Sequence, residues 1–163
     1  LNWINSQYIK KMELPILYEF IKKDWVDKGW ESPSQDWDLK LTNLIRDSMI
    51  LLKDAIDQSK PFFSISQIQR EGRLFLENNK EAKESLKYIL NYLKKENISK
   101  INSTNAREII SKISTNHSIK KGIVMKSLRV AFFGCLSGPD LIQSWELFSE
   151  NKSDITLIER CII

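Results

Sequence analysis

The chain has 163 residues, of which 42% are hydrophobic and 28% charged, a composition typical of folded globular proteins rather than disordered ones. No apolar run reaches the roughly 18 residues of a membrane-spanning helix, and the N-terminus lacks the basic and apolar regions of a signal peptide. The first residue is not Met, so we expect a piece of a longer chain. Two cysteines, Cys135 and Cys161, are too few for a disulfide scaffold or a thiolate metal site, which favours a reducing, cytoplasmic setting.

Turn-forming residues are scarce, with five glycines and four prolines in the whole chain. Sandwiches and barrels need turn residues at short spacing, and doubly wound folds need glycine-rich turns between strand and helix. An all-α fold is therefore predicted.

Charge is unevenly distributed along the chain. Residues 97–131 hold seven basic residues and one acidic residue, a net charge of +6, whereas residues 132–163 carry a net charge of −3. A basic segment beside an acidic one gives the molecule a positive side, which would attract a polyanion such as a nucleic acid. A solvated helical face accounts for the same composition equally well.

Apolar periodicity predicts the helices of the first half of the chain. A helix over residues 14–25 is ended by Gly29, and Ser34 or Asp36 caps the next one. That second helix carries an apolar stripe over residues 41–56 and is broken by Pro61. Ser48 lies inside the stripe, which we interpret as a small residue that lets another helix approach closely.

The second half continues with helices of the same kind. Apolar stripes lie over residues 82–93, 109–113, 124–135 and 141–148, after a less regular segment at residues 65–76. Asn105 is predicted to begin the helix over residues 109–113, and Gly134 or Gly138 to end the helix over residues 124–135. Pro139 is predicted in the first turn of the helix over residues 141–148, and Ser153 is predicted to cap a last short helix. Such an order predicts a helical bundle, or two small bundles in tandem.

Residues of the types used in catalysis are few, and none lies at a spacing from other such residues that would indicate an active site or a metal site. His117 is expected in an exposed polar loop without metal-ligand spacing, and Cys135 is expected to be a buried structural thiol on an apolar stripe. No glycine-rich phosphate loop is present. Trp3, Trp25, Trp30 and Trp37 are interpreted as packing residues around the first helices.

Three segments, in order, carry a resemblance to a known protein family. Residues 125–141 read MKSLRVAFFGCLSGPDL and are similar to the L-R-x-A…G…G-P block of the C-terminal anticodon-binding region in bacterial-type glutamyl-tRNA synthetases. Residues 1–9, LNWINSQYI, resemble the segment that follows the catalytic core, and residues 52–55, LKDA, with Phe62 and Phe63 resemble a helix ahead of an aromatic pair. The chain departs from the pattern at Phe133, where many relatives have Thr.

The resemblance implies an organisation and a function. It implies that residues 1–12 end a stem-contacting domain and that residues 13–70 and 71–163 form two helical anticodon-binding subdomains. The chain would lack the class I catalytic domain, where ATP and Mg act, would hold no cofactor or metal, and would not activate glutamate by itself. The alternative is a helical protein–protein interaction domain with a solvated basic face.

The implied partner is tRNA(Glu), bound by a monomer. Arg129 would read anticodon bases, and Gly138, Pro139 and Leu141 would shape the loop and helix start that meet the anticodon, although a plain helix start explains Gly138 and Pro139 as well. Lys120, Lys121 and Lys126 would attract phosphates without regard to sequence. Ser48 stands where family members specific for tRNA(Glu) carry an arginine that reads the first anticodon base, which implies that tRNA(Gln) is also accepted.

Overall fold

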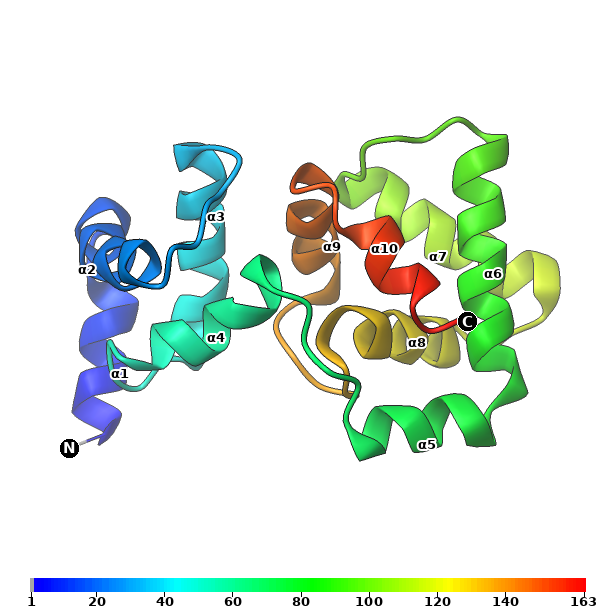
Figure 1. Cartoon of the computed structure of the whole chain (residues 1–163), viewed down its shortest axis with the longest axis horizontal. Coiled ribbons are helices and arrows are strands. Elements are labelled where there is room, and N and C mark those ends of the chain that lie inside the picture. The colour runs from blue at the N-terminus through cyan, green and yellow to red at the C-terminus, as the bar shows by residue number, and fades with distance from the viewer. Residues whose placement is uncertain (1) are drawn as a thin grey trace. The chain divides into compact units, whose positions relative to one another are not determined.

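The computed structural model describes residues 2–163, with side chains from Asn5 onward. All regular structure in these residues is helical, with ten α-helices, one 3-10 turn and no strand, which confirms the all-α prediction (Figure 1). The chain forms two compact units, one through Ile65 and one over Ser66–Ile163. The expected boundary between the two subdomains lies after residue 70, whereas the two units divide after Ile65, and Arg70 is already the first residue of a helix. The first unit also includes the residues up to 12 that the resemblance assigns to a stem-contacting domain, and that assignment stays a prediction.

Aromatic side chains form much of the core of the first unit. The ring of Phe63 stacks on Trp30 with centroids 4.9 Å apart and lies 5.1 Å from Trp25 and 5.3 Å from Trp37. The packing role predicted for these tryptophans is confirmed, while the side chain of Trp3 lies outside the described ones. The helices of this unit are α1 (Asn2–Lys11), α2 (Leu14–Asp27), α3 (Gln35–Ile45), the 3-10 turn η1 (Arg46–Ser48) and α4 (Asp54–Phe63).

Two of the predicted helix boundaries in this unit are confirmed. The Ser34 hydroxyl accepts a 3.2 Å hydrogen bond from the backbone N–H of Trp37, so Ser34 and not Asp36 caps α3. Gly29 follows the end of α2 with a φ of +72°, a conformation that favours glycine.

The single helix predicted over residues 41–56 is wrong, because the chain turns after α3. Arg46 is buried, and its guanidinium donates to the carbonyls of Ile9, at 2.7 Å, and of Met12 at the end of α1. The Asp54 carboxylate accepts from the N–H groups of Ile50 and Leu51 at 2.9 and 2.8 Å and starts α4. Contacts with α1 thus replace the continuation of the helix. Pro61 lies inside α4, two residues before its end, rather than breaking a longer helix.

The second unit is built around one central helix. It contains α5 (Arg70–Asn78), α6 (Lys80–Lys95), α7 (Ser103–His117), α8 (Lys121–Phe133), α9 (Leu141–Glu150) and α10 (Asp154–Glu159). The other five helices all contact α8, whose side chains from Val124 to Phe133 are largely buried. Although α8 is central, part of one face of this helix stays exposed, and this face carries the basic residues discussed below.

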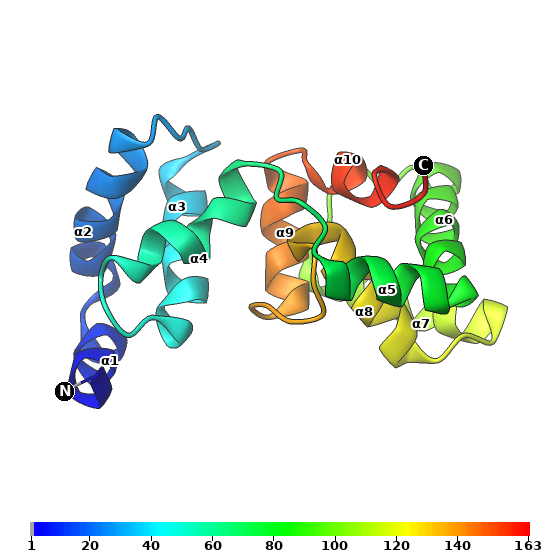
Figure 2. The ribbon, with the colours of Figure 1, turned by 60° about the horizontal axis from the view of Figure 1, so that its bottom comes forward.

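The start of the second unit is held against the end of α8, as Figure 2 shows for α5. Gly72 makes this possible, because a Cβ there would lie 2.6 Å from the carbonyl oxygen of Gly134. Arg160 also joins these segments, donating to the carbonyl of Ala131 at 2.7 Å and to that of Ser66.

Two caps of the second unit differ from prediction. Helix α7 begins at Ser103 rather than Asn105, because Asn102 and Asn105 form a reciprocal capping box. Ser153 precedes α10 as predicted, but its hydroxyl donates to the carbonyl of Phe148 at 3.2 Å instead of capping the helix.

Candidate nucleic-acid interface

Residues 134–140 form a turn between α8 and α9 that is held at both ends, and we refer to it as the 134–140 turn. Gly134 closes α8 with a φ of +75°, as predicted, and its carbonyl accepts a 2.8 Å hydrogen bond from the N–H of Gln69. At the other end, the Asp140 carboxylate caps α9 by accepting from the N–H of Gln143 at 2.9 Å. Pro139 lies just before this cap and not in the first turn of the helix, where we expected it.

Arg129 and Pro139, both predicted site residues, are brought together by this turn. The half-buried guanidinium of Arg129 donates from Nη1 to the Pro139 carbonyl at 2.9 Å. A guanidinium has five N–H donors, so this bond leaves most of them for another acceptor. Arg129 therefore holds the turn and also presents a charged, planar group beside it.

Gly138 is a structural requirement of the turn. Its φ is +152°, and a Cβ would lie 2.8 Å from Cδ2 of the Phe133 ring. We expected the glycine to allow close approach of a ligand, whereas in this structure it allows close approach of a phenyl ring. Ser137 and Gly138 are exposed, so their backbone is accessible. Leu141 is 2% exposed, which limits its predicted contact to backbone atoms.

A basic face runs along α8 toward the turn; we define it as Lys120, Lys121, Lys126 and Arg129. The last three lie within an arc of about 140° on the helix, at 100° per residue. All three lysines are exposed, and none forms an ion pair with a carboxylate in the part of the chain that the structure describes. Lys112 differs, because its Nζ lies 2.8 Å from the Glu108 carboxylate. The basic face that leads to the 134–140 turn is therefore made of cations that are not paired with carboxylates of the described residues.

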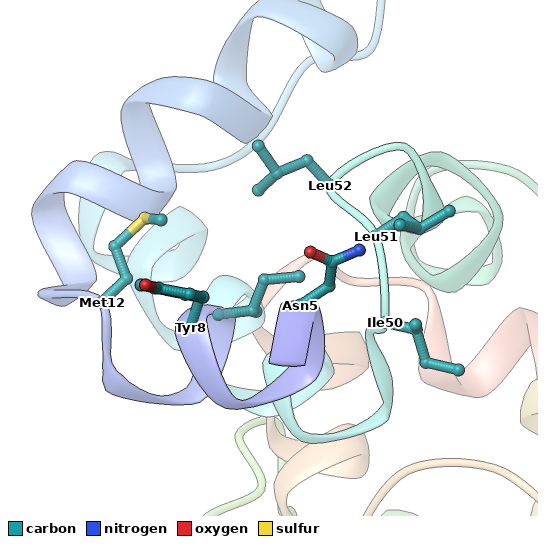
Figure 3. A pocket seen from close by; sticks show the side chains of 7 residues that line it. Asn5, Tyr8, Met12, Ile50, Leu51 and Leu52 are labelled. Atoms are coloured by element: carbon teal, nitrogen blue, oxygen red, sulfur yellow. The ribbon is translucent and has the colours of Figure 1, made fainter. Parts of the chain in front are cut away.

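Ser48 lies in the first unit, exposed on η1, so the interpretation of it as a residue for close helix packing is wrong. Its hydroxyl is 3.0 Å from the Ile45 carbonyl and 3.1 Å from Oε1 of Gln58. Next to this turn, the residues after Met49 and one face of α1 border a pocket of about 300 Å³ (Figure 3). Its lining is mainly apolar and consists of Asn5, Tyr8, Ile9, Met12, Ile50, Leu51 and Leu52.

Two residues for which we expected no catalytic role, His117 and Cys135, have structural surroundings that differ from those predicted. His117 is exposed, but it ends α7 instead of lying in a loop, and its ring stacks on Tyr88 with centroids 3.5 Å apart and planes 3° apart. Cys135 is partly exposed in the 134–140 turn, with Sγ 3.4 Å from the Ser137 carbonyl, so the predicted burial of this thiol is wrong. Helix α8 ends at Phe133, two residues before Cys135, which removes this thiol from the apolar stripe.

Sequence reasoning missed Gly72, Gln67 and Gln69, which hold the turn from α5 and the segment before it. A Cβ on Gly134 would collide with the carbonyl oxygen of Gln67, and this contact joins positions 67 residues apart in sequence. No local pattern marks such a contact. The glycine inside α5 was the one available signal, since glycine within a helix often marks close packing.

Within residues 2–163, no group of three or more His, Cys, Asp or Glu side chains is placed to hold a metal ion. None of the helices in that part of the chain combines the length and apolar character needed to cross a membrane.

Comparisons with known proteins relate the chain to a family. A family model described as "Anticodon binding domain" matches residues 7–154. Over 161 residues the chain is 79% identical to the glutamate–tRNA ligase of Prochlorococcus marinus subsp. pastoris, and over 163 residues it is 77% identical to that of P. marinus strain MIT 9515. These alignments include 99% and 100% of this chain, which spans 34% of each relative's length.

Solved structures support the same fold. A glutamate tRNA ligase from Elizabethkingia meningosepticum matches with a TM-score of 0.82 at 22% identity, covering 99% of this chain and 31% of that one. A glutamate-tRNA synthetase from E. anophelis matches with a TM-score of 0.78 at 24% identity, covering 99% of this chain and 30% of that one. With the family match over most of its length, the chain belongs to the anticodon-binding domain family and corresponds to the C-terminal region of glutamate–tRNA ligases.

Proposed function

We propose that this chain binds the anticodon of tRNA(Glu) and holds that tRNA for glutamylation by a catalytic part present in the longer relatives. The observation that carries the proposal is the pairing of Arg129 with the 134–140 turn at the end of the unpaired basic face of α8, in a chain of the anticodon-binding family. ATP and Mg would act in the catalytic part, and the role of the chain described here would be to bind and position RNA.

Each part of the site has a distinct physical task in this proposal. The lysines of the basic face attract phosphates without regard to sequence, because a point charge does not distinguish bases. The guanidinium of Arg129 offers a planar set of donors that fits a base edge or a phosphate, and a flat face on which an unstacked base can lie. The exposed backbone of Ser137 and Gly138 can approach the loop closely, because little side chain stands in the way.

A salt titration tests the proposal. We expect the chain to bind an anticodon stem-loop RNA of tRNA(Glu) with an affinity that falls steeply as salt rises, because phosphate contacts release counterions. Lys121→Ala should weaken binding to all stem-loops alike and flatten the salt slope. Lys40→Ala is the matched control, since Lys40 is exposed but paired with Asp36 at 3.1 Å. Binding that ignores salt, or an equal effect of both variants, would contradict the proposal.

The proposal extends to tRNA(Gln) through Ser48. The exposed hydroxyl is short and already lies near Ile45 and Gln58, so it offers the first anticodon base little discrimination. The chain should therefore bind stem-loops of tRNA(Glu) and tRNA(Gln) with similar affinity, and Ser48→Arg should favour tRNA(Glu). Rejection of the tRNA(Gln) stem-loop by the unchanged chain would refute this extension.

The protein–protein interaction alternative has no specific observation in its favour, while the family match favours RNA binding. The expected monomeric state and cytoplasmic location stay predictions.

A further inference from the structure

The stacked pair of Tyr88 and His117 has no role in the site described above. Tyr88 projects from α6 and is partly buried, whereas His117 is exposed at the last position of α7. The rings are parallel, 3.5 Å apart, so one face of the imidazole rests on the phenol ring. His117 as a whole residue is exposed, so the contact with Tyr88 does not enclose it.

The surroundings of the pair are basic and continuous with the basic face of α8. Lys120 and Lys121 follow His117 by three and four residues and begin α8. One turn further along α6, Tyr92 lies against Lys112 of α7, whose Nζ is 3.1 Å from the phenol oxygen. The carboxylate of Glu108 is paired with Lys112 at 2.8 Å, and that of Glu84, one turn before Tyr88 on α6, lies 3.9 Å from Nζ of Lys80.

An aromatic ring that is supported beneath and open above is a stacking platform. Proteins that bind single-stranded nucleic acid combine such rings with cationic side chains that follow the backbone, because every base has a π face and every linkage a charge. Tyr88 limits rotation of the imidazole, so less conformational entropy is lost when a base lands on it.

We propose that His117, supported by Tyr88, stacks an unpaired nucleotide of the bound RNA, with Lys120 and Lys121 holding the adjoining phosphates. The inference rests on the proposed function, but it places a second contact at the opposite end of α8 from Arg129. Arg129 lies eight residues after Lys121 on α8, about 12 Å along the helix axis, so the two contacts grip the RNA at separate nucleotides.

The test is the affinity of the whole chain for the tRNA(Glu) anticodon stem-loop at fixed salt. His117→Ala should weaken binding at least about fivefold, in line with the loss of one aromatic–base stack. His117→Phe should keep the affinity within about twofold, because it retains an aromatic ring and loses only the two ring nitrogens and their hydrogen bonds. Asn116→Ala, at the exposed neighbouring position, is the matched control and should have no effect.

A second measurement locates the nucleotide. Stem-loops that carry the fluorescent base 2-aminopurine at one loop position at a time should show one position that loses its binding-induced quenching with His117→Ala but not with His117→Phe. Thermal unfolding of each variant confirms that it folds.

The outcomes separate this inference from the proposed function. If the unchanged chain binds no stem-loop, the proposed function fails and the platform fails with it. If the chain binds and Lys121→Ala weakens it, but His117→Ala does not, the platform alone is wrong. If His117→Phe is as weak as His117→Ala, stacking is not what His117 contributes, and the inference is overturned.

Discussion

The guanidinium of Arg129 donates a 2.9 Å hydrogen bond to the backbone carbonyl of Pro139, ten residues further along the chain. The residue that we propose to contact RNA therefore also sets the shape of the turn that would receive it. Removal of its side chain must act in two ways, on the charge beside the turn and on the order of the turn itself.

Variants at Arg129 can separate these two effects. Arg129→Ala should lower the affinity for the tRNA(Glu) stem-loop by about 1–3 kcal/mol, relax discrimination among anticodons, and speed amide hydrogen exchange at residues 135–138. Arg129→Lys can keep one donor for the Pro139 carbonyl but not the planar fork, so exchange should stay slow while discrimination falls. Unchanged affinity and anticodon preference in Arg129→Ala would show that Arg129 does not read bases.

Gly138→Ala is expected to destabilise the chain. A φ of +152° is strained for any residue with a side chain, and the added Cβ would lie 2.8 Å from the Phe133 ring. We expect a loss of about 1–3 kcal/mol in the free energy of unfolding, measured with urea. In a double-mutant cycle with Phe133→Leu, part of the loss should be recovered, because the clash is removed and only the backbone strain remains. Complete additivity would show that the ring is not the obstacle.

Replacing Gly72 and replacing Gly122 by alanine should have opposite effects on the free energy of unfolding, although both glycines lie in helices. A Cβ at Gly72 would lie 2.6 Å from the Gly134 carbonyl oxygen, so Gly72→Ala must push α5 away from α8 and cost about 1–3 kcal/mol. At Gly122 nothing lies within 4 Å of the added Cβ, and the higher helix propensity of alanine should stabilise the chain by up to about 1 kcal/mol. Urea unfolding of both variants provides the test, and destabilisation by Gly122→Ala would refute the second half.

Asp154 should make stability depend on pH. Asp154 is 6% exposed, its carboxylate accepts from Nε1 of Trp145 at 3.2 Å, and burial raises its pKa in the folded chain. The folded state then binds a proton at higher pH than the unfolded state, so this group stabilises the chain at low pH and the contribution is lost as pH rises through the raised pKa.

Asp154→Asn keeps an acceptor for Trp145 and cannot titrate. The free energy of unfolding of the variant, relative to the original chain, should be most favourable at neutral pH, and this advantage should shrink as pH falls toward the ordinary carboxyl pKa of about 3.9. Urea unfolding at several pH values measures the difference. A difference that does not change with pH would contradict the raised pKa.

The sequence by itself determined the helical class and several helix boundaries, because these depend on neighbours within a turn or two. Scarce turn residues, helix caps and helix-ending glycines all act over a few residues. The structure confirms the all-α class, and of the predicted alternatives it selects Ser34 over Asp36 and Gly134 over Gly138. The family motif at residues 125–141 could also be recognised from the sequence, since such a motif is a property of consecutive residues. The basic segment before Arg129 was visible as a charge imbalance.

Only the tertiary structure decided what these residues touch. The helix predicted through Ser48 stops at Ile45 because Arg46 bonds to carbonyls of α1, some 37 residues away in sequence. The stack of His117 on Tyr88 and the contact of Gly72 with Gly134 likewise join positions that no periodicity relates. Local patterns report the free energy of a segment with its own neighbours, whereas these contacts depend on which helices pack together, and that is settled by the burial of the whole apolar core.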